Sequence, residues 1–161
     1  MKYCKKCVNP ASRPNTFFNK EGLCPVCEYE IKKVKDSIDW SQRWEEIQKI
    51  KQWGSDSTKS TYDCIVTVSG GKDSTRQAFF ARDDLGMNPL LVACLYPPEQ
   101  LHSRGAYNIA NLINNGFDCL SISLDPIKWK KLMKQGFFQF GNWCKSTEMA
   151  LYALPVHVAI A

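Results

Sequence analysis

The stretch Cys64-Ile-Val-Thr-Val68, followed at once by Ser69-Gly-Gly-Lys-Asp-Ser74, decides the expected fold. Its first five residues are mostly apolar and largely β-branched, which is typical of a strand buried in a parallel sheet. The two glycines allow a sharp turn, and a helix is expected from about Ser74 to Leu85, stopped by Gly86. A strand, a glycine-rich turn and a helix in this order indicate an α/β domain.

The same alternation continues downstream. Further strands are expected over 90–95 and 119–124, and helices over 104–115 and 126–140, the last with a break at Gly136. This order predicts a doubly wound parallel sheet with right-handed crossovers, which binds ligands at the carboxyl ends of its strands. Near the end, Val156, Val158 and Ile160 alternate with other residues as they would in a strand.

The N-terminal region contains two C-x-x-C pairs, Cys4/Cys7 and Cys24/Cys27, separated by sixteen residues. Tetrahedral zinc takes four thiolates, and this spacing is typical of a small zinc ribbon. Four cysteines close the coordination shell, so the expected zinc is structural. Reduced, unligated cysteines or a redox pair are the alternative.

The region between the cysteines and the sheet is expected to be helical. One helix is expected from Glu28 to about Ser37, and a second is opened by Asp39, with Gln42 completing a capping box. Gly54 is expected to end the second helix, and residues 54–61 are expected to form a linker. The resulting domains are a zinc-binding module over 1–30, a helical connector and linker over 31–61, and an α/β domain over 62–161.

Composition sets broad limits on the protein class. The chain has 161 residues, is 44% hydrophobic and carries a net charge of +5, as expected for a globular protein with an anionic ligand. This charge does not establish nucleic-acid binding. The sequence offers no targeting segment and no run long enough to span a membrane, so a cytoplasmic location with reduced thiols is expected.

The loop after the first strand differs from a Walker A loop, because Val66 occupies the position of the first glycine and Asp73 follows Lys72. Its expected ligand is still a phosphate. Backbone N–H groups at Gly70 and Gly71 and the start of the helix face an anion, and Lys72 adds a positive charge. The hydroxyls of Ser69 and Ser74 donate hydrogen bonds, and the Asp73 carboxylate suits a magnesium ion held against phosphate oxygens.

Residues 69–74, placed after a strand, resemble the PP-loop ATP pyrophosphatases, which share the HUP type of sheet. The N-terminal block C-x-x-C-V-N-P-x-x-R-P…F-N-x-E-G-x-C-x-x-C and the segment Gly141-Asn-Trp-Cys-Lys-Ser-Thr-Glu-Met149 narrow the resemblance to the N-acetyl sugar amidotransferases. Members of that family are longer, so the resemblance implies a sheet truncated to three or four strands. It also implies a helix over 151–161, against the strand-like alternation there.

The resemblance implies an enzyme of lipopolysaccharide or other surface-glycan biosynthesis that adenylates the N-acetyl oxygen of a nucleotide sugar. Ammonia from a separate glutaminase and its channel partner then displaces AMP and leaves an acetamidino group. The implied cofactors are ATP, Mg²⁺ and structural Zn²⁺; Lys72 and Asp73 are the implied catalytic residues, and residues 69–74 bind the nucleotide. No membrane or nucleic-acid partner is expected. The alternatives are a tRNA-modifying PP-loop enzyme and a non-catalytic zinc- and nucleotide-binding module.

Two further residues, Cys144 and His102, each allow two interpretations. Cys144 is either a packed small hydrophobic residue or a group that faces the sugar or the adenylate. His102, near the carboxyl end of the second expected strand, is either an exposed loop residue or part of the ligand site.

Overall fold

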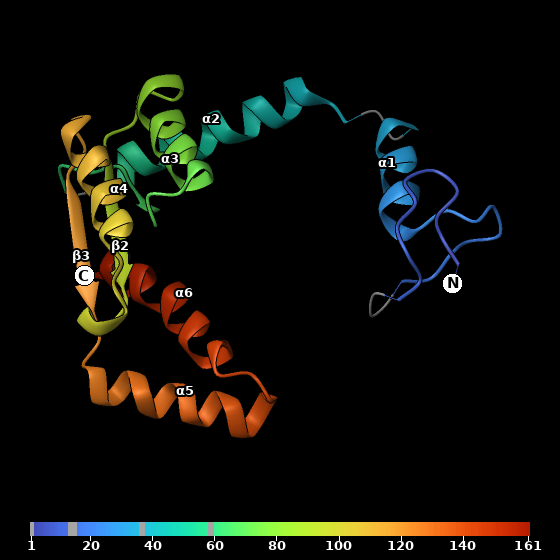
Figure 1. Ribbon diagram of the computed structural model, residues 1–161. Helices are drawn as coiled ribbons and strands as arrows, with labels where there is room; N and C mark the ends of the chain where they lie inside the picture. Colours follow the sequence, from blue (N-terminus) through green and yellow to red (C-terminus); the bar gives the residue numbers. More distant parts are fainter. Residues whose placement is uncertain (1, 13–15, 36–37, 58–59) are drawn as a thin grey trace. The chain divides into compact units, whose positions relative to one another are not determined.

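The structure is a computed structural model that describes residues 2–12, 16–35, 38–57 and 60–161. Backbone contacts divide the chain into two compact units, Met1–Glu46 and Ile47–Ala161, and the division falls inside one long helix. Each unit is described by itself. Figure 1 shows the order of their helices and strands.

The first unit contains little regular structure apart from its helices. An isolated antiparallel bridge joins Tyr3 to Pro10, and helix α1 runs over Pro25–Lys35. The helix therefore begins three residues before the expected Glu28, and the expected end at Ser37 lies outside the described residues. A proline in the first turn suits a helix start, because its missing N–H has no helical partner there.

Helix α2 runs over Trp40–Ser57, and the expectation that Gly54 ends it is wrong. Gly54 is buried, and a Cβ at this position would lie 3.0 Å from the carbonyl oxygen of Asp63. The glycine thus permits a close approach to the chain that enters the sheet. At the other end, the Gln42 N–H donates to Asp39 Oδ1 at 2.9 Å, as expected for a cap, whereas the Gln42 side chain bonds Glu46 instead. Residues 58–59 of the expected linker lie outside the described residues.

The second unit is built on a sheet of three parallel strands, β1 (Cys64–Thr67), β2 (Pro89–Leu95) and β3 (Cys119–Ser123), in the order β1-β2-β3. Val66 pairs with Leu91, and Cys94 with Ile122. Helix α3 (Lys72–Phe79), extended by the π-helical turn η1 (Phe80–Asp84), joins β1 to β2. A 3-10 turn η2 (Pro98–Gln100) and helix α4 (Ser103–Asn114) join β2 to β3. The expected parallel α/β sheet is confirmed.

Alternate residues of β2 are buried on opposite faces of the sheet. Leu91 and Ala93 point to one face and belong to the main core. The other buried residues of this core are Val68, Ala78, Leu112 and Phe117. That core lies between the sheet and the helices α3 and α4. Val92 points the other way and is also fully buried, on the face where helix α6 contacts β1 and β2. Helices therefore cover both faces of the sheet.

The last two helices are α5 (Pro126–Phe140) and α6 (Cys144–Ile160), which meet at a short turn and diverge from it (Figure 1). The expected break at Gly136 is absent: a Cβ there would lie 2.9 Å from the Asn142 carbonyl oxygen, so this glycine lets the helices pack closely. Residues 156–160 are helical, which overturns the strand-like pattern and confirms the helix implied by the resemblance. Among the described residues, the structure contains no helix long and apolar enough to cross a membrane.

Candidate functional site

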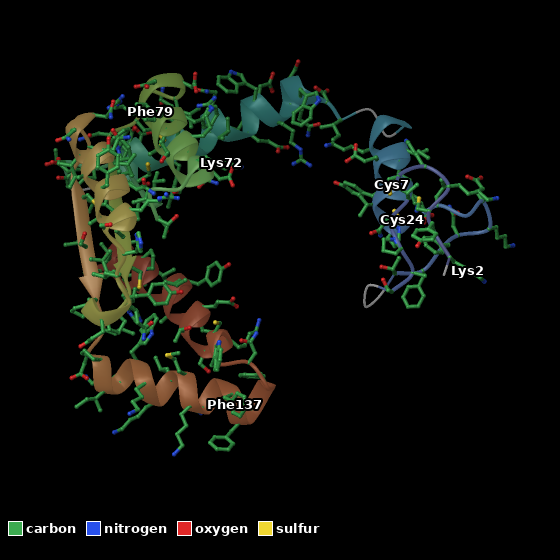
Figure 2. All side chains as sticks on the ribbon, viewed as in Figure 1. Lys2, Cys7, Cys24, Lys72, Phe79 and Phe137 are labelled. Carbon is green, nitrogen blue, oxygen red and sulfur yellow. The ribbon has the colours of Figure 1, made fainter. Side chains whose placement is uncertain are left out.

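The four N-terminal cysteines form one compact cluster. The sulfur atoms of Cys4, Cys7, Cys24 and Cys27 all lie within 4.8 Å of one another, and three of the side chains are buried while Cys7 is exposed. The two C-x-x-C pairs meet where Cys7 Sγ lies 3.6 Å from Cys24 Sγ (Figure 2). The sequence expectation that these four residues come together is confirmed.

Backbone hydrogen bonds fix the two cysteine pairs against each other. The Cys24 N–H donates to Cys4 Sγ at 3.3 Å, the Lys6 N–H to the same sulfur at 3.4 Å, and the Lys5 N–H to the Gly22 carbonyl at 3.1 Å. Gly22 has φ of +82°, and a Cβ there would lie 2.9 Å from the Lys5 side chain. The turn before the second pair therefore favours glycine because of its positive φ.

The protonation of the cluster depends on these contacts. Hydrogen bonds from backbone N–H groups, first that of Cys7, lower the pKa of Cys4 to about 6. At Cys27, hydrogen bonds with the neighbouring thiols, first that of Cys7, act together with burial and raise the pKa to about 12. The two shifts have different causes: backbone N–H groups stabilise a thiolate at Cys4, whereas packing against other sulfurs disfavours one at Cys27.

The donor set fits zinc. Four sulfurs in a tetrahedron with Zn–S bonds of about 2.3 Å lie about 3.8 Å apart, and the 3.6 Å between Cys7 and Cys24 is near that value. Thiolates bind the metal only after losing their protons, so a bound zinc ion would hold all four groups deprotonated, including Cys27. The four cysteines could hold a zinc ion.

The second candidate site is the loop at the carboxyl end of β1. Its backbone turns at Gly70, which has φ of +74°. A Cβ at Gly70 would lie 2.6 Å from Asn108 Cβ and 2.9 Å from the Asn108 carbonyl carbon. Both the backbone conformation and the contact with α4 therefore exclude a side chain at this position.

The loop is closed by its own serines. The Ser69 N–H donates to Ser74 Oγ at 3.3 Å, the Ser74 hydroxyl donates to the Gly71 carbonyl at 3.2 Å, and the Gly71 N–H donates to Ser69 Oγ at 3.4 Å. Both hydroxyls thus shape the loop and remain exposed to solvent. The expectation that they donate to phosphate stays a prediction.

Helix α3 begins at Lys72 with Gly71 as its N-cap, and no side chain caps it. The N–H groups of its first turn are therefore left for water or a ligand, at the positive end of the helix dipole. Lys72 Nζ lies 2.7 Å from Asp73 Oδ1, and both side chains are largely exposed. Lys72 projects from the start of α3 (Figure 2). The helix begins two residues before the expected Ser74, so Lys72 and Asp73 lie in its first turn.

A cavity of about 500 Å³ opens beside this loop. Ser69 lines its edge, and the end of β2 and one face of α4 form its walls. Its lining is mainly apolar, with a few polar groups: Ser69, Gln100, His102 and Ser121. Cavities of this size and character are typical of sites for small ligands.

Tyr96 and His102 contribute to the cavity, and only His102 was considered from the sequence. His102 caps α4, because its Nδ1 accepts from the Arg104 N–H at 3.1 Å. The Tyr96 ring packs edge-on against Trp129, and burial, followed by the charges of Cys144, Cys94 and Glu148, raises the pKa of Tyr96. The position of Tyr96 directly after β2 could have indicated from the sequence that it lies at the site, because ligands bind at the carboxyl ends of parallel strands.

Cys144 is exposed at the first position of α6, and its N–H donates to Asn142 Oδ1 at 2.9 Å. It is therefore not a packed core residue.

Comparison with known proteins adds no assignment: no protein-family model matches the chain, and no match is found among curated proteins.

Proposed function

We propose that this chain is an ATP-dependent amidotransferase of the PP-loop type, acting on the N-acetyl group of a nucleotide sugar. The observation that carries the proposal is the loop Ser69–Ser74 at the carboxyl end of β1, open on one side to the 500 Å³ cavity. Its resemblance to the PP-loop and that of Gly141–Met149 to the sugar amidotransferases supply the reaction. ATP, Mg²⁺ and the sugar are part of the proposal.

In this proposal the nucleotide spans the loop and the cavity. The β- and γ-phosphates lie against the N–H groups of the first turn of α3, and Lys72 neutralises charge on the departing pyrophosphate. The Asp73 carboxylate, released from its contact with Lys72, holds the magnesium ion. The apolar wall formed by Leu95, Ile109 and neighbouring residues accepts the adenine.

The chemistry has two steps. The amide oxygen attacks the α-phosphorus and expels pyrophosphate, which gives an imidoyl adenylate. The nitrogen of ammonia then attacks the imidoyl carbon, the bond to the adenylate oxygen breaks, and AMP leaves from a protonated amidine. Adenylation is needed because the amide oxygen is a poor leaving group, whereas AMP is a good one. Ammonia is proposed to come from a separate glutaminase through a channel partner.

The test is ATP–pyrophosphate exchange with a panel of UDP-N-acetyl sugars. One sugar should stimulate exchange, and Lys72→Ala should reduce the rate by about 100-fold, as expected for removal of a charge that acts on the leaving group. Lys130→Ala, an exposed lysine of α5, is the matched control and should leave the rate unchanged. Zinc-loaded, folded protein that shows no exchange with any sugar would refute the amidotransferase proposal. ATP binding without exchange would instead favour the non-catalytic module.

The charge distribution favours a second candidate, a PP-loop enzyme that modifies tRNA. Residues 1–35 contain eight Lys and Arg but only three Glu, and the rest of the chain is balanced, so the formal charge of +5 lies in this segment. With four thiolates and one Zn²⁺ bound, the charge of the segment is about +3. A basic N-terminal segment is a suitable contact for phosphates. For this candidate, tRNA affinity should fall steeply with salt. Affinity that is absent or independent of salt excludes it.

A further inference from the structure

Helix α6 presents a continuous apolar stripe to solvent. Buried residues, such as Thr147 and Pro155, mark its inner side, and α6 contacts β1 and β2. Four large residues on its outer side have exposed fractions of 61%, 79%, 56% and 78%: Met149, Tyr152, Val156 and Ile160. Spacings of three, four and four residues place them on one helix face. An exposed apolar row of this kind marks a site of interaction.

A shallow, open depression on this stripe is lined by Met149, Tyr152, Ala153, Val156 and His157. The first four of these stand at positions i, i+3, i+4 and i+7 of the helix. Four residues at these positions form the hole that receives one side chain from a facing helix in knobs-into-holes packing. Ala153, the smallest of them, leaves room for the incoming side chain. The surface is therefore shaped to receive another apolar helix.

We propose that this facing helix is α6 of a second copy of the chain, packed antiparallel about a two-fold axis. The stripe supplies both the hole and knobs at the matching spacing, which a two-fold contact of one surface with itself requires. In this register Met149 faces Ile160 of the second copy, and Tyr152 faces Val156 of the second copy.

The charges of α6 favour the antiparallel direction. Apart from His157, its only Lys, Arg, Asp or Glu residues are Lys145 and Glu148, both near its start. An antiparallel pair keeps these charged residues at opposite ends of the interface. A parallel pair would place Lys145 beside Lys145 and Glu148 beside Glu148 of the second copy, so like charges would repel. The single lysine also gives this face no positive surplus for anionic lipid or nucleic acid.

The interface is small. Burying the four exposed side chains from both copies removes roughly 1,000 Å² from water, which is about the lower limit for a specific protein interface. The dimer is consequently weak, and its population depends on protein concentration.

The test is sedimentation of the full zinc-loaded chain at concentrations from about 10 to about 400 µM, a range suited to a weak complex. A reversible equilibrium between the 18.4 kDa monomer and its dimer is expected. Tyr152→Glu should raise the dissociation constant at least about tenfold, because the interface would bury an unpaired charge. Tyr107→Glu is the matched control: Tyr107 is 72% exposed on α4, and its replacement should have no effect.

Far-UV circular dichroism and metal content establish that each variant is folded. If Tyr152→Glu does not fold, Val156→Glu replaces it in the same measurement. A chain that stays monomeric at every concentration overturns the proposal. Equal weakening by Tyr107→Glu also overturns it, as does association beyond a dimer that the stripe variants do not reduce.

Discussion

Each of the two units of this molecule is stabilised internally by a different kind of interaction. In the first, the buried cluster consists of Cys4, Cys24 and Cys27, with only Phe18 and Leu23 packed against it. In the second, the buried cluster consists of aliphatic and aromatic residues from strand β2, helices α3 and α4 and two loops. Burial of a few thiols cannot offset the entropy of ordering a chain segment, so we expect the first unit to depend on a bound metal ion, whereas the second is stabilised by apolar burial.

The largest expected effect comes from breaking the metal site. Cys24→Ser removes a buried ligand, so zinc should be lost and the first unit should unfold, at a cost of several kcal/mol of metal-binding free energy. The second unit should keep its hydrogen-exchange protection. Zinc content and exchange measured residue by residue report the two outcomes. Cys144→Ser, at an exposed thiol, is the control. Unchanged zinc stoichiometry in Cys24→Ser would show that this cysteine is not a ligand.

The opposite result is expected for a core substitution. Leu91 is fully buried in β2, and Leu91→Ala should lower the free energy of unfolding of the second unit by about 2–5 kcal/mol through a lost apolar contact and a cavity. Zinc should remain bound. Leu120→Ala, at an exposed position of β3, should cost far less. Denaturant unfolding followed by fluorescence measures both. Loss of zinc in Leu91→Ala would mean that the units are not independent.

A smaller effect is expected at the loop. Gly70→Ala forces a Cβ into Asn108 at a backbone conformation that favours glycine, and it should destabilise the second unit by about 1–3 kcal/mol. ATP affinity, measured by calorimetry, should also fall. Gly105→Ala offers a contrast, because a Cβ there meets nothing within 4 Å and α4 should become slightly more stable. Equal stability of the two variants would contradict the strained geometry assigned to Gly70.

The smallest effect concerns the start of α5. Backbone N–H groups of Lys128 and Ile127 lower the pKa of Asp125 below 3.8. A lowered pKa stabilises the folded state at pH values above 3.8, and this contribution is lost as the pH falls through the folded-state pKa. Asp125→Asn keeps a capping side chain, so its melting temperature should be slightly below that of the wild type at pH 7 and equal to it at low pH. A difference that persists at pH 2 would point to geometry instead of charge.

Much of the fold was predictable because it depends on local sequence. The β-branched run at 64–68 and the Asp39 cap of α2 act through neighbouring residues, and the three strands of the sheet lie where they were expected. The cysteine cluster was equally accessible, since ligand type and spacing together indicate a metal site. The errors fall at glycines and at the end of the chain.

From the sequence, Gly54 and Gly136 both predict the end or interruption of a helix, because the sequence does not show which residues pack against a glycine. In the structure each lies inside a helix and permits a close contact, with Asp63 and Asn142 respectively. Likewise, Val156, Val158 and Ile160 fit a strand by alternation, yet they belong to α6 because the Cys144–Ile160 segment packs as one helix against β1, β2 and α5. Short apolar runs do not distinguish the two periods.

The sequence alone determined the cysteine cluster, the parallel α/β order and the loop after β1, since these depend on residue type and on spacing along the chain. The tertiary structure decided that Gly70 is pressed against Asn108, that Tyr96 and Ser121 line the cavity beside the loop, and that α6 has an exposed apolar side. These features join residues far apart in the chain. Their physical basis is the packing of whole elements, which no local pattern contains.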